Sequence, residues 1–224
     1  MTKHKPQLLI FDLDDTLVPG EFIYAEALAK LGITSDDPIF LKARAEVKNL
    51  LPAFAPAARS RYLYFKKYLE LKNDYSPSKA NTIAENYETE VVRLMTLSWN
   101  QLNRTSLFKQ LRRLNKSIAV ITNESCRFQT KKLAAFEGEN SLFDYLLTSE
   151  EMGVEKPSAS LFQQVLKHFN MAPEQSLMIG DSHKNDIQPC LTLKIPCIQS
   201  IEFNKSEPRA STVIESLDQI LDFI

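Results

Sequence analysis

The sequence lacks a charge excess, a cysteine framework and a long hydrophobic run, and each absence excludes a class of protein. The net charge is -1 and the pI is near 6.3, so there is no global attraction to nucleic acid or to an anionic membrane. Cys126, Cys190 and Cys197 form no close-spaced metal pattern and cannot all pair within the chain, which indicates reduced thiols. No apolar run approaches the length of a membrane span, and the polar N-terminal residues do not resemble a signal peptide. We therefore predict a cytoplasmic protein without a nucleic-acid or membrane partner.

The composition is ordinary for a soluble globular protein, with 44% apolar and 25% charged residues in a chain of 224. This length allows one large domain or two small ones. From Thr16 to about Trp99 only helical patterns occur, whereas strand and helix patterns alternate afterwards. We predict a discontinuous α/β core of residues 1–17 and 100–224, with an inserted all-helical cap domain of residues 18–99.

Apolar residues at helical spacing, bounded by turn and capping residues, predict four helices in the insert. These are residues 21–31 closed by Gly32, about 38–51 after Asp37, a helix through Ala58, Tyr62, Phe65 and Leu69, and a helix after Ser76 with Ile83, Tyr87, Val91 and Leu94 on one face.

The remaining chain alternates between short apolar runs and helical patterns. The predicted strands are residues 8–11, 118–121, 145–147, 177–179 and 195–198. The predicted helices are residues 107–114, 126–136, 158–169 and 185–193. Residues 211–223 are expected to form a short strand or turn followed by an amphipathic helix. Such alternation indicates right-handed crossovers and a parallel sheet with helices on both faces, a Rossmann-like α/β fold.

Three carboxylates, Asp12, Asp14 and Asp15, follow the first apolar run. In extended backbone, Asp12 and Asp14 lie on one side and Asp15 on the other. Like charges held close together cost stability unless a cation or a shared proton relieves them, which is typical of functional sites. These residues alone fit an acidic turn with a capping Asp equally well.

Polar side chains end three of the predicted strands at one edge of the sheet. Asp12 follows the first strand, Thr122 the second and Asp181 a later one, and Lys156 lies in a loop that leaves the same edge. Ligands of open parallel sheets bind at this edge. Each residue singly has an ordinary structural explanation, but together they favour a phosphoryl-transfer site.

In this interpretation Asp12 attacks phosphorus and forms an aspartyl-phosphate. A carboxylate is repelled by a phosphate dianion, so the site needs a cation, and Mg²⁺ held by Asp12 and Asp181 would supply it. Lys156 would offset the phosphate charge, while Thr122 and nearby backbone N–H groups would hold the phosphate oxygens. Asp14 would protonate the leaving alcohol and then take a proton from water.

These residues resemble the motifs of the haloacid dehalogenase-like (HAD) hydrolase superfamily. The matching segments are Phe11 to Leu17, Ile121-Thr122-Asn123, Glu155-Lys156-Pro157 and Gly180 to Asp186. A helical cap inserted just after the first motif is the family's class I arrangement. The resemblance therefore spans nearly the whole chain.

The resemblance also implies roles for some residues that their spacing in the sequence does not indicate. Asp14 would offer its backbone carbonyl to the metal beside Asp12 and Asp181, and Asn123 would join Thr122 and Lys156 in substrate binding. Asp186 would support the metal or orient Lys156. The cap would close over the substrate and exclude water.

One segment departs from the family pattern. Relatives often carry a Gly-Ala pair and a later Gly after the fourth motif, where this chain has Gln188-Pro189-Cys190 and Lys194. The departure concerns the packing of this helix and none of the catalytic positions. With five glycines in all, the chain reads as a divergent member.

We predict a Mg²⁺-dependent phosphatase that hydrolyses a small phosphorylated metabolite. A phosphomutase would use the same core and stays an alternative. A dehalogenase-type C–X hydrolase is a second alternative, but such an enzyme needs no acid at the position of Asp14, so the presence of Asp14 argues against it. A non-enzymatic phospho-accepting module is a third alternative, but such modules are near half the length of this chain. We expect Asp15 to be structural. The sequence does not indicate an oligomeric state.

The predicted cap is rich in cations, which outnumber the acids Glu46 and Glu70 on its second and third helices. They are Arg44, Lys48, Arg59, Arg61, Lys66, Lys67 and Lys72. We interpret them as solvated helix faces. The alternative is that they attract an acidic or doubly phosphorylated substrate.

Overall fold

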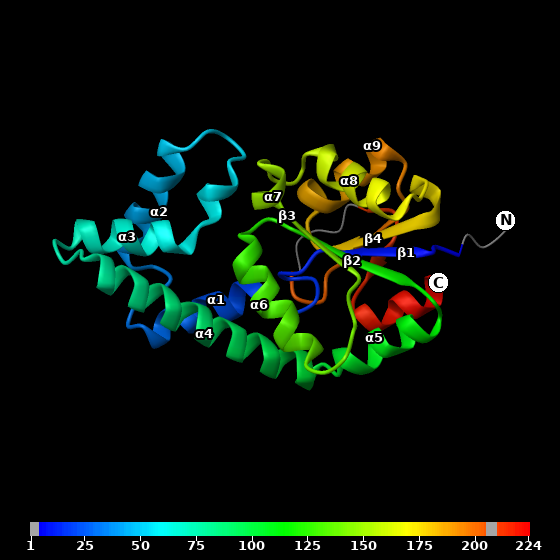
Figure 1. Cartoon of the computed structure of the whole chain (residues 1–224), viewed down its shortest axis with the longest axis horizontal. Helices are drawn as coiled ribbons and strands as arrows, with labels where there is room; N and C mark the ends of the chain where they lie inside the picture. The colour runs from blue at the N-terminus through cyan, green and yellow to red at the C-terminus, as the bar shows by residue number, and fades with distance from the viewer. Residues whose placement is uncertain (1–4, 205–209) are drawn as a thin grey trace.

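The computed structural model describes residues 5–204 and 210–224, and its centre is a parallel sheet (Figure 1). The sheet has the order β3-β2-β1-β4-β5-β6, and every neighbouring pair is parallel. Its strands are β1 (Leu8–Phe11), β2 (Ser117–Thr122), β3 (Tyr145–Thr148), β4 (Ser176–Gly180), β5 (Cys197–Ser200) and β6 (Val213–Ile214). The first strand is thus central, with β2 and β4 on either side, and residues 1–4 of the predicted polar N-terminus lie outside the described residues.

Helices cover both faces of the sheet, which confirms the predicted Rossmann-like α/β fold (Figure 1). Leu8 and Ile10 of β1 pack toward α8 and α9, whereas Leu9 and Phe11 belong to the cluster that includes α5 and α6. The helices are α5 (Arg104–Arg113), α6 (Cys126–Glu137), α7 (Ser149–Met152), α8 (Ala159–Phe169) and α9 (Gln188–Leu193), with 3-10 turns at Pro173–Gln175 and Leu217–Phe223. Because β1 is buried on both faces, its continuous apolar run needs no alternation.

The segment between β1 and α5 is helical and extends away from the sheet (Figure 1). It contains α1 (Gly20–Lys30), α2 (Pro38–Leu50), a 3-10 turn (Pro56–Arg59), α3 (Arg61–Leu71) and α4 (Pro77–Gln101). Asp37 and Ser76 cap α2 and α4 by accepting bonds from backbone N–H groups of the first turn, and each helix has proline early in that turn. No helix among the described residues combines the length and the apolar character needed to cross a bilayer.

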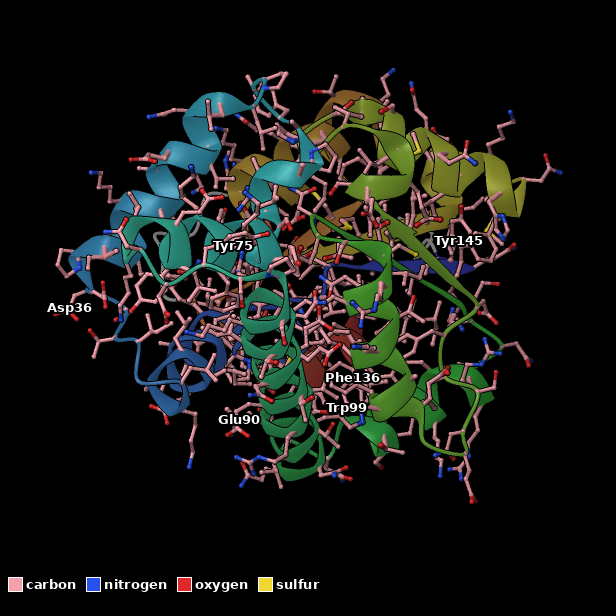
Figure 2. The ribbon with its side chains drawn as sticks, turned by 60° about the vertical axis from the view of Figure 1, so that its left-hand side comes forward. Asp36, Tyr75, Glu90, Trp99, Phe136 and Tyr145 are labelled. Atoms are coloured by element: carbon pink, nitrogen blue, oxygen red, sulfur yellow. The ribbon has the colours of Figure 1, made fainter. Side chains whose placement is uncertain are left out.

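Aromatic packing joins this helical segment to the sheet layer. The rings of Trp99 on α4 and Phe136 on α6 stack with their centroids 4.5 Å apart and an interplanar angle of 3°, as the adjacent labels in Figure 2 indicate. The buried Arg104 ties the two ends of the segment, because its Nε donates to the Leu17 carbonyl at 3.1 Å. The two parts of the chain therefore share one continuous core.

The buried face of α4 differs from the predicted one. Tyr87 and Val91 are buried as expected, but Ile83 and Leu94 are only half-buried. The other buried positions of α4 are Ala80, Ala84, Met95 and Trp99. The face is rotated because α4 packs against α6 as well as against α1 and α3.

The predicted strand at 195–198 is displaced by two residues, since β5 runs from Cys197 to Ser200. The Ile195 N–H is already used, because it donates to the Cys190 carbonyl at the end of α9. Pro196 has no N–H to donate. Donors are therefore available to the ladder only from Cys197 onward.

The predicted helix at 185–193 is composite. A π-helical turn, His183–Ile187, comes first because the N–H groups of Asp186 and Ile187 both donate to the Ser182 carbonyl. The α-helix α9 follows and ends at Lys194, which has the left-handed φ of 60°. Lys194 thus occupies the left-handed conformation for which glycine is favoured.

Candidate active site

All the residues predicted from the motifs line one cavity of about 260 Å³ at the carboxyl ends of β1, β2 and β4. They are Asp12, Asp14, Thr122, Asn123, Lys156, Asp181 and Asp186. The structure therefore confirms that the polar residues at these strand ends lie close together. Tyr24, Arg59, Arg61 and Glu124 also line the cavity.

A buried lysine between two carboxylates forms the centre of the site. Lys156 Nζ donates to Asp12 Oδ1 at 2.6 Å, to Asp186 Oδ1 at 2.7 Å and to the Ile121 carbonyl at 3.1 Å. Burial alone would lower the pKa of Lys156, but the two carboxylates raise it above its usual value. Lys156 therefore stays charged.

Desolvation sets the acidity of Asp12 and Asp181. Burial raises the pKa of Asp12 to about 7, although the charge of Lys156 opposes this shift. Burial likewise raises the pKa of Asp181 to about 6, and repulsion from Asp12 adds to it. Both carboxyls are thus shielded from water at this edge of the sheet.

Gly180 allows Asp186 to approach the end of β4. A Cβ atom at position 180 would lie 2.6 Å from the Cβ of Asp186, which is closer than real Cβ contacts. The second oxygen of Asp186 accepts the backbone N–H of Ser182 at 3.0 Å. Both oxygens of Asp186 are thus engaged, so its geometry favours the orientation of Lys156 over direct binding of a metal.

Asn123 holds the backbone on which Lys156 lies. Its Nδ2 donates to the Lys156 carbonyl at 3.0 Å, and the Lys156 backbone N–H donates to Asn123 Oδ1 at 2.7 Å. This reciprocal pair fixes the loop relative to the end of β2. Thr122, one residue earlier, is buried, and its Oγ1 accepts from Gln129 Nε2 at 2.7 Å.

Asp14 contacts two side chains of α6 that the sequence reasoning missed. Lys132 Nζ lies 3.0 Å from Asp14 Oδ1 and donates to the Tyr24 hydroxyl at 2.6 Å, and Gln129 Nε2 lies 3.2 Å from Asp14 Oδ2. Burial opposes ionisation, but Lys132 and these hydrogen bonds lower the pKa of Asp14 below its usual value. The sequence did contain a signal for these two contacts, because Gln129 and Lys132 interrupt the apolar face of α6. Buried polar side chains of this kind have hydrogen-bond or charge partners.

The expectation that Asp15 points away from the site is wrong. The backbone leaves the extended conformation after the first strand, because the Leu17 N–H donates to the Leu13 carbonyl and Asp15 has a φ of 61°. Asp15 consequently lines the same cavity as Asp12. Its Oδ1 also accepts the Glu21 N–H at the start of α1, at 3.0 Å.

We expect Asp15→Asn to keep kcat/KM within about tenfold of the wild type, far above the activity of an Asp12 or Asp14 variant. Asparagine tolerates the left-handed conformation and retains an oxygen that can accept the Glu21 N–H. Steady-state kinetics on one phosphate ester would measure this. A loss of a thousandfold or more in a folded variant would place Asp15 among the reacting groups.

Asp12, Asp181 and Asp186 bring carboxylate oxygens within 4.8 Å of one another, which fits a small divalent cation. Asp181 Oδ2 accepts from Asn204 at 3.1 Å, and its backbone carbonyl accepts from Gln199 at 3.0 Å. Within residues 5–204 and 210–224, Asp12 Oδ2 and Asp181 Oδ1 have no hydrogen-bond donor. Oxygen-only donors of this kind suit Mg²⁺.

Two cations of the helical segment reach the cavity, so their interpretation as solvated surface residues is wrong. Arg59 makes two bonds to the buried Glu155, at 3.0 and 3.3 Å. The guanidinium of Arg61 lies over the ring of Tyr24, 4.9 Å from its centroid. The 3-10 turn Pro56–Arg59 and the start of α3 hold both side chains above the sheet edge.

Fold and site together define an α/β protein whose charged groups gather at the carboxyl edge of a parallel sheet. The chain belongs to the haloacid dehalogenase-like hydrolases, because the model of that family matches residues 6–191. The resemblance in the four motifs is thereby confirmed, and the protein is a hydrolase.

Relatives named as phosphatases are similar over most of the chain. Ribulose-1,5-bisphosphate 5-phosphatase of Halopiger xanaduensis is 30% identical over 223 residues, covering 94% of this chain and 89% of that protein. Phosphoserine phosphatase of Thermus thermophilus is 27% identical, covering 81% of this chain and 83% of that protein. These relatives are named for different phosphate esters.

Solved structures confirm the fold. The putative HAD-hydrolase YfnB from Bacillus subtilis, bound to magnesium, matches with a TM-score of 0.67 at 19% identity, covering 97% of this chain and 98% of that chain. A HAD phosphatase from Thermococcus onnurineus matches with a TM-score of 0.66 at 17% identity, covering 96% of each chain.

Proposed function

We propose that this chain is a Mg²⁺-dependent phosphatase that hydrolyses a small phosphorylated metabolite through an aspartyl-phosphate on Asp12. The observation that carries the proposal is the buried Asp12 beside the buried Lys156 at the cavity. The phosphatase names of the relatives support the same class of reaction. Membership in a hydrolase family argues against the non-enzymatic phospho-accepting alternative.

In the first half of the reaction, Asp12 would attack the phosphorus atom. Lys156 donates to Asp12 Oδ1 at 2.6 Å and so orients the carboxylate that supplies the attacking oxygen. The new bond joins Asp12 to phosphorus while the bond from phosphorus to the ester oxygen breaks. Lys156 and the hydroxyl of Thr122 would offset and hold the charge of the transferring group.

Asp14 would serve as the proton-transfer group in both halves. Lys132 and Gln129 hold its carboxylate in place. A bound phosphate dianion brings negative charge beside Asp14, which raises its affinity for the proton that the leaving alcohol then takes. The resulting carboxylate can take a proton from the water that attacks the aspartyl-phosphate.

Asp12, Asp181 and the backbone carbonyl of Asp14 would hold Mg²⁺, with Asp186 orienting Lys156 behind them. When bound, the ion would neutralise charge on the carboxylate and on the phosphate as they approach. We also propose that residues 18–99 act as a cap over the core of residues 1–17 and 100–224, because Arg59 and Arg61 enter the cavity from that segment.

We expect Mg²⁺ to raise the melting temperature more at pH 7.5 than at pH 5.5. Burial raises the pKa of Asp12 to about 7 and of Asp181 to about 6, so at low pH the ion must displace protons to bind. Without the ion, the folded state binds these protons more tightly than the unfolded state, so this contribution to stability falls as pH rises from about 4 to 7. Differential scanning fluorimetry at both values would test this, and an equal shift at both would contradict it.

Hydrolysis of a generic aryl phosphate with and without Mg²⁺ tests the function itself. We expect phosphate release that requires the ion and disappears with EDTA. A panel of phosphorylated metabolites would then identify the ester. No turnover of any member, by folded protein with Mg²⁺ present, would overturn the proposal.

A further inference from the structure

A second cavity, of about 340 Å³, adjoins the candidate active site on the side of the helical segment. Asp15, Tyr24 and Arg61 line both cavities, so the two meet at these residues. A ligand whose phosphate lies at Asp12 can therefore extend past Arg61 into the second cavity. The reaction proposed above uses none of the groups at its far end.

Positive charge at this far end is only weakly compensated. Arg44 of α2 lines the second cavity, and its contact is with the Tyr64 ring, whose centroid is 5.8 Å from the guanidinium carbon. No carboxylate within residues 5–204 and 210–224 forms an ion pair with Arg44. Arg61 has one, Glu124, at the long distance of 3.9 Å. Two guanidinium groups thus face one cavity with little neutralisation.

A buried hydroxyl lies beside Arg61 in the same cavity. Tyr87 is fully buried and lines the second cavity. Arg61 is the charged group that acts on its hydroxyl most strongly. Tyr87 therefore helps to hold the Arg61 guanidinium at the cavity.

The junction with the active site carries both signs of charge, because Asp15 and Arg61 line both cavities. Asp15 already accepts the Glu21 N–H, and Glu21 itself is exposed. A carboxylate at a junction can accept hydrogen bonds from hydroxyl groups of a ligand. Arg44 lines only the second cavity.

We propose that the second cavity is a subsite for a second anionic group, held by Arg44 and Arg61, so that the substrate is a small hydroxylated metabolite with a phosphate at one end and a carboxylate or phosphate at the other. This inference rests on the proposed function and names its substrate class. Guanidinium groups bind both anions through paired N–H donors.

Binding of compounds that cannot be hydrolysed tests the subsite without turnover. The probes are linear phosphonocarboxylates of three to five carbons, their carboxyl methyl esters, and the matching bisphosphonates, titrated calorimetrically in buffer with Mg²⁺. We expect at least one doubly anionic member to bind wild type about tenfold more tightly than its ester. The carboxylate and phosphonate arms then show which anion the subsite prefers.

Arg44→Met is the decisive variant, because Arg44 is half-exposed and no ion pair among the described residues depends on it. It should remove most of the tenfold preference and leave affinity for the esters within twofold. Lys42→Met on the same helix removes the same charge from a side chain that is 64% exposed, and should change neither affinity. Equal binding of acid and ester by wild type, or equal weakening of both by Arg44→Met, would overturn the subsite.

The two proposals fail separately. Hydrolysis of phosphate esters without any preference for a second anion would support the phosphatase and reject the subsite. Selective, Arg44-dependent binding of the doubly anionic probes without turnover of any ester would support the subsite and reject the phosphatase.

Discussion

Asp12→Asn should lower kcat by about four orders of magnitude or more, because it removes the carboxylate that we propose as the nucleophile. The change is nearly isosteric, and it leaves the contact of Lys156 with Asp186 intact at 2.7 Å. Asp12 is also the carboxyl whose pKa burial raises to about 7, so a neutral side chain is tolerated there. We therefore expect the free energy of unfolding to stay within about 1 kcal/mol of the wild type.

Two measurements separate a chemical role of Asp12 from a structural one. Denaturant unfolding would establish that the variant is folded, and steady-state kinetics would give kcat. Acid quenching with a labelled phosphate ester should leave label on wild-type protein and none on Asp12→Asn. Asp15→Asn, an identical change three residues along the chain, is the matched control and should retain the label. Equal labelling of Asp12→Asn and wild type would assign the nucleophile elsewhere.

Lys156→Met should destabilise the protein by about 3–5 kcal/mol and abolish turnover. Lys156 is 3% exposed and lies between Asp12 and Asp186, so its removal leaves two buried carboxylates without a counter-charge. Their pKa values would rise further. The variant should therefore become more stable as pH falls from 8 toward 5, since its folded state binds protons more tightly than its unfolded state.

A second substitution makes this prediction specific. Lys156→Met with Asp186→Asn removes one of the two uncompensated carboxylates and should recover at least 1 kcal/mol relative to Lys156→Met alone. Lys131→Met is the control for loss of a lysine, because its ion pair with Glu88 lies at the surface and should contribute less than about 1 kcal/mol. If Lys156→Met proves no more destabilising than Lys131→Met, Lys156 is not the counter-charge of the site.

The sheet and the central site could be predicted because their signals are local. Leu8 to Phe11 is a continuous apolar run that ends in acids, and the ends of β1, β2 and β4 meet by the geometry of any parallel sheet. The conformation of Asp15 could not be predicted in this way. Period-two alternation holds only while the backbone is extended, and it turns left-handed at this residue.

The cationic residues of the cavities depend on tertiary packing. Lys132 of α6 reaches Asp14 and Tyr24 across more than one hundred residues of sequence, and Arg61 lines the cavity at the start of α3, directly after a 3-10 turn. A helical pattern indicates which residues share a face, but it does not indicate what that face meets. The sequence therefore identified an excess of cations in the helical segment without separating Arg44, Arg59 and Arg61 from the rest.

The stacking of Trp99 on Phe136 affects how the protein unfolds. Helices α1 to α4 and the sheet layer do not have separate interiors, since α4 buries its aromatic side chain against α6. Melting of either part would expose apolar surface of the other, so their free energies of unfolding are coupled. Arg104 adds to this coupling by joining α5 to the end of the first motif at Leu17. Unfolding should accordingly be one cooperative event in which the candidate active site and the helices α1 to α4 are lost together.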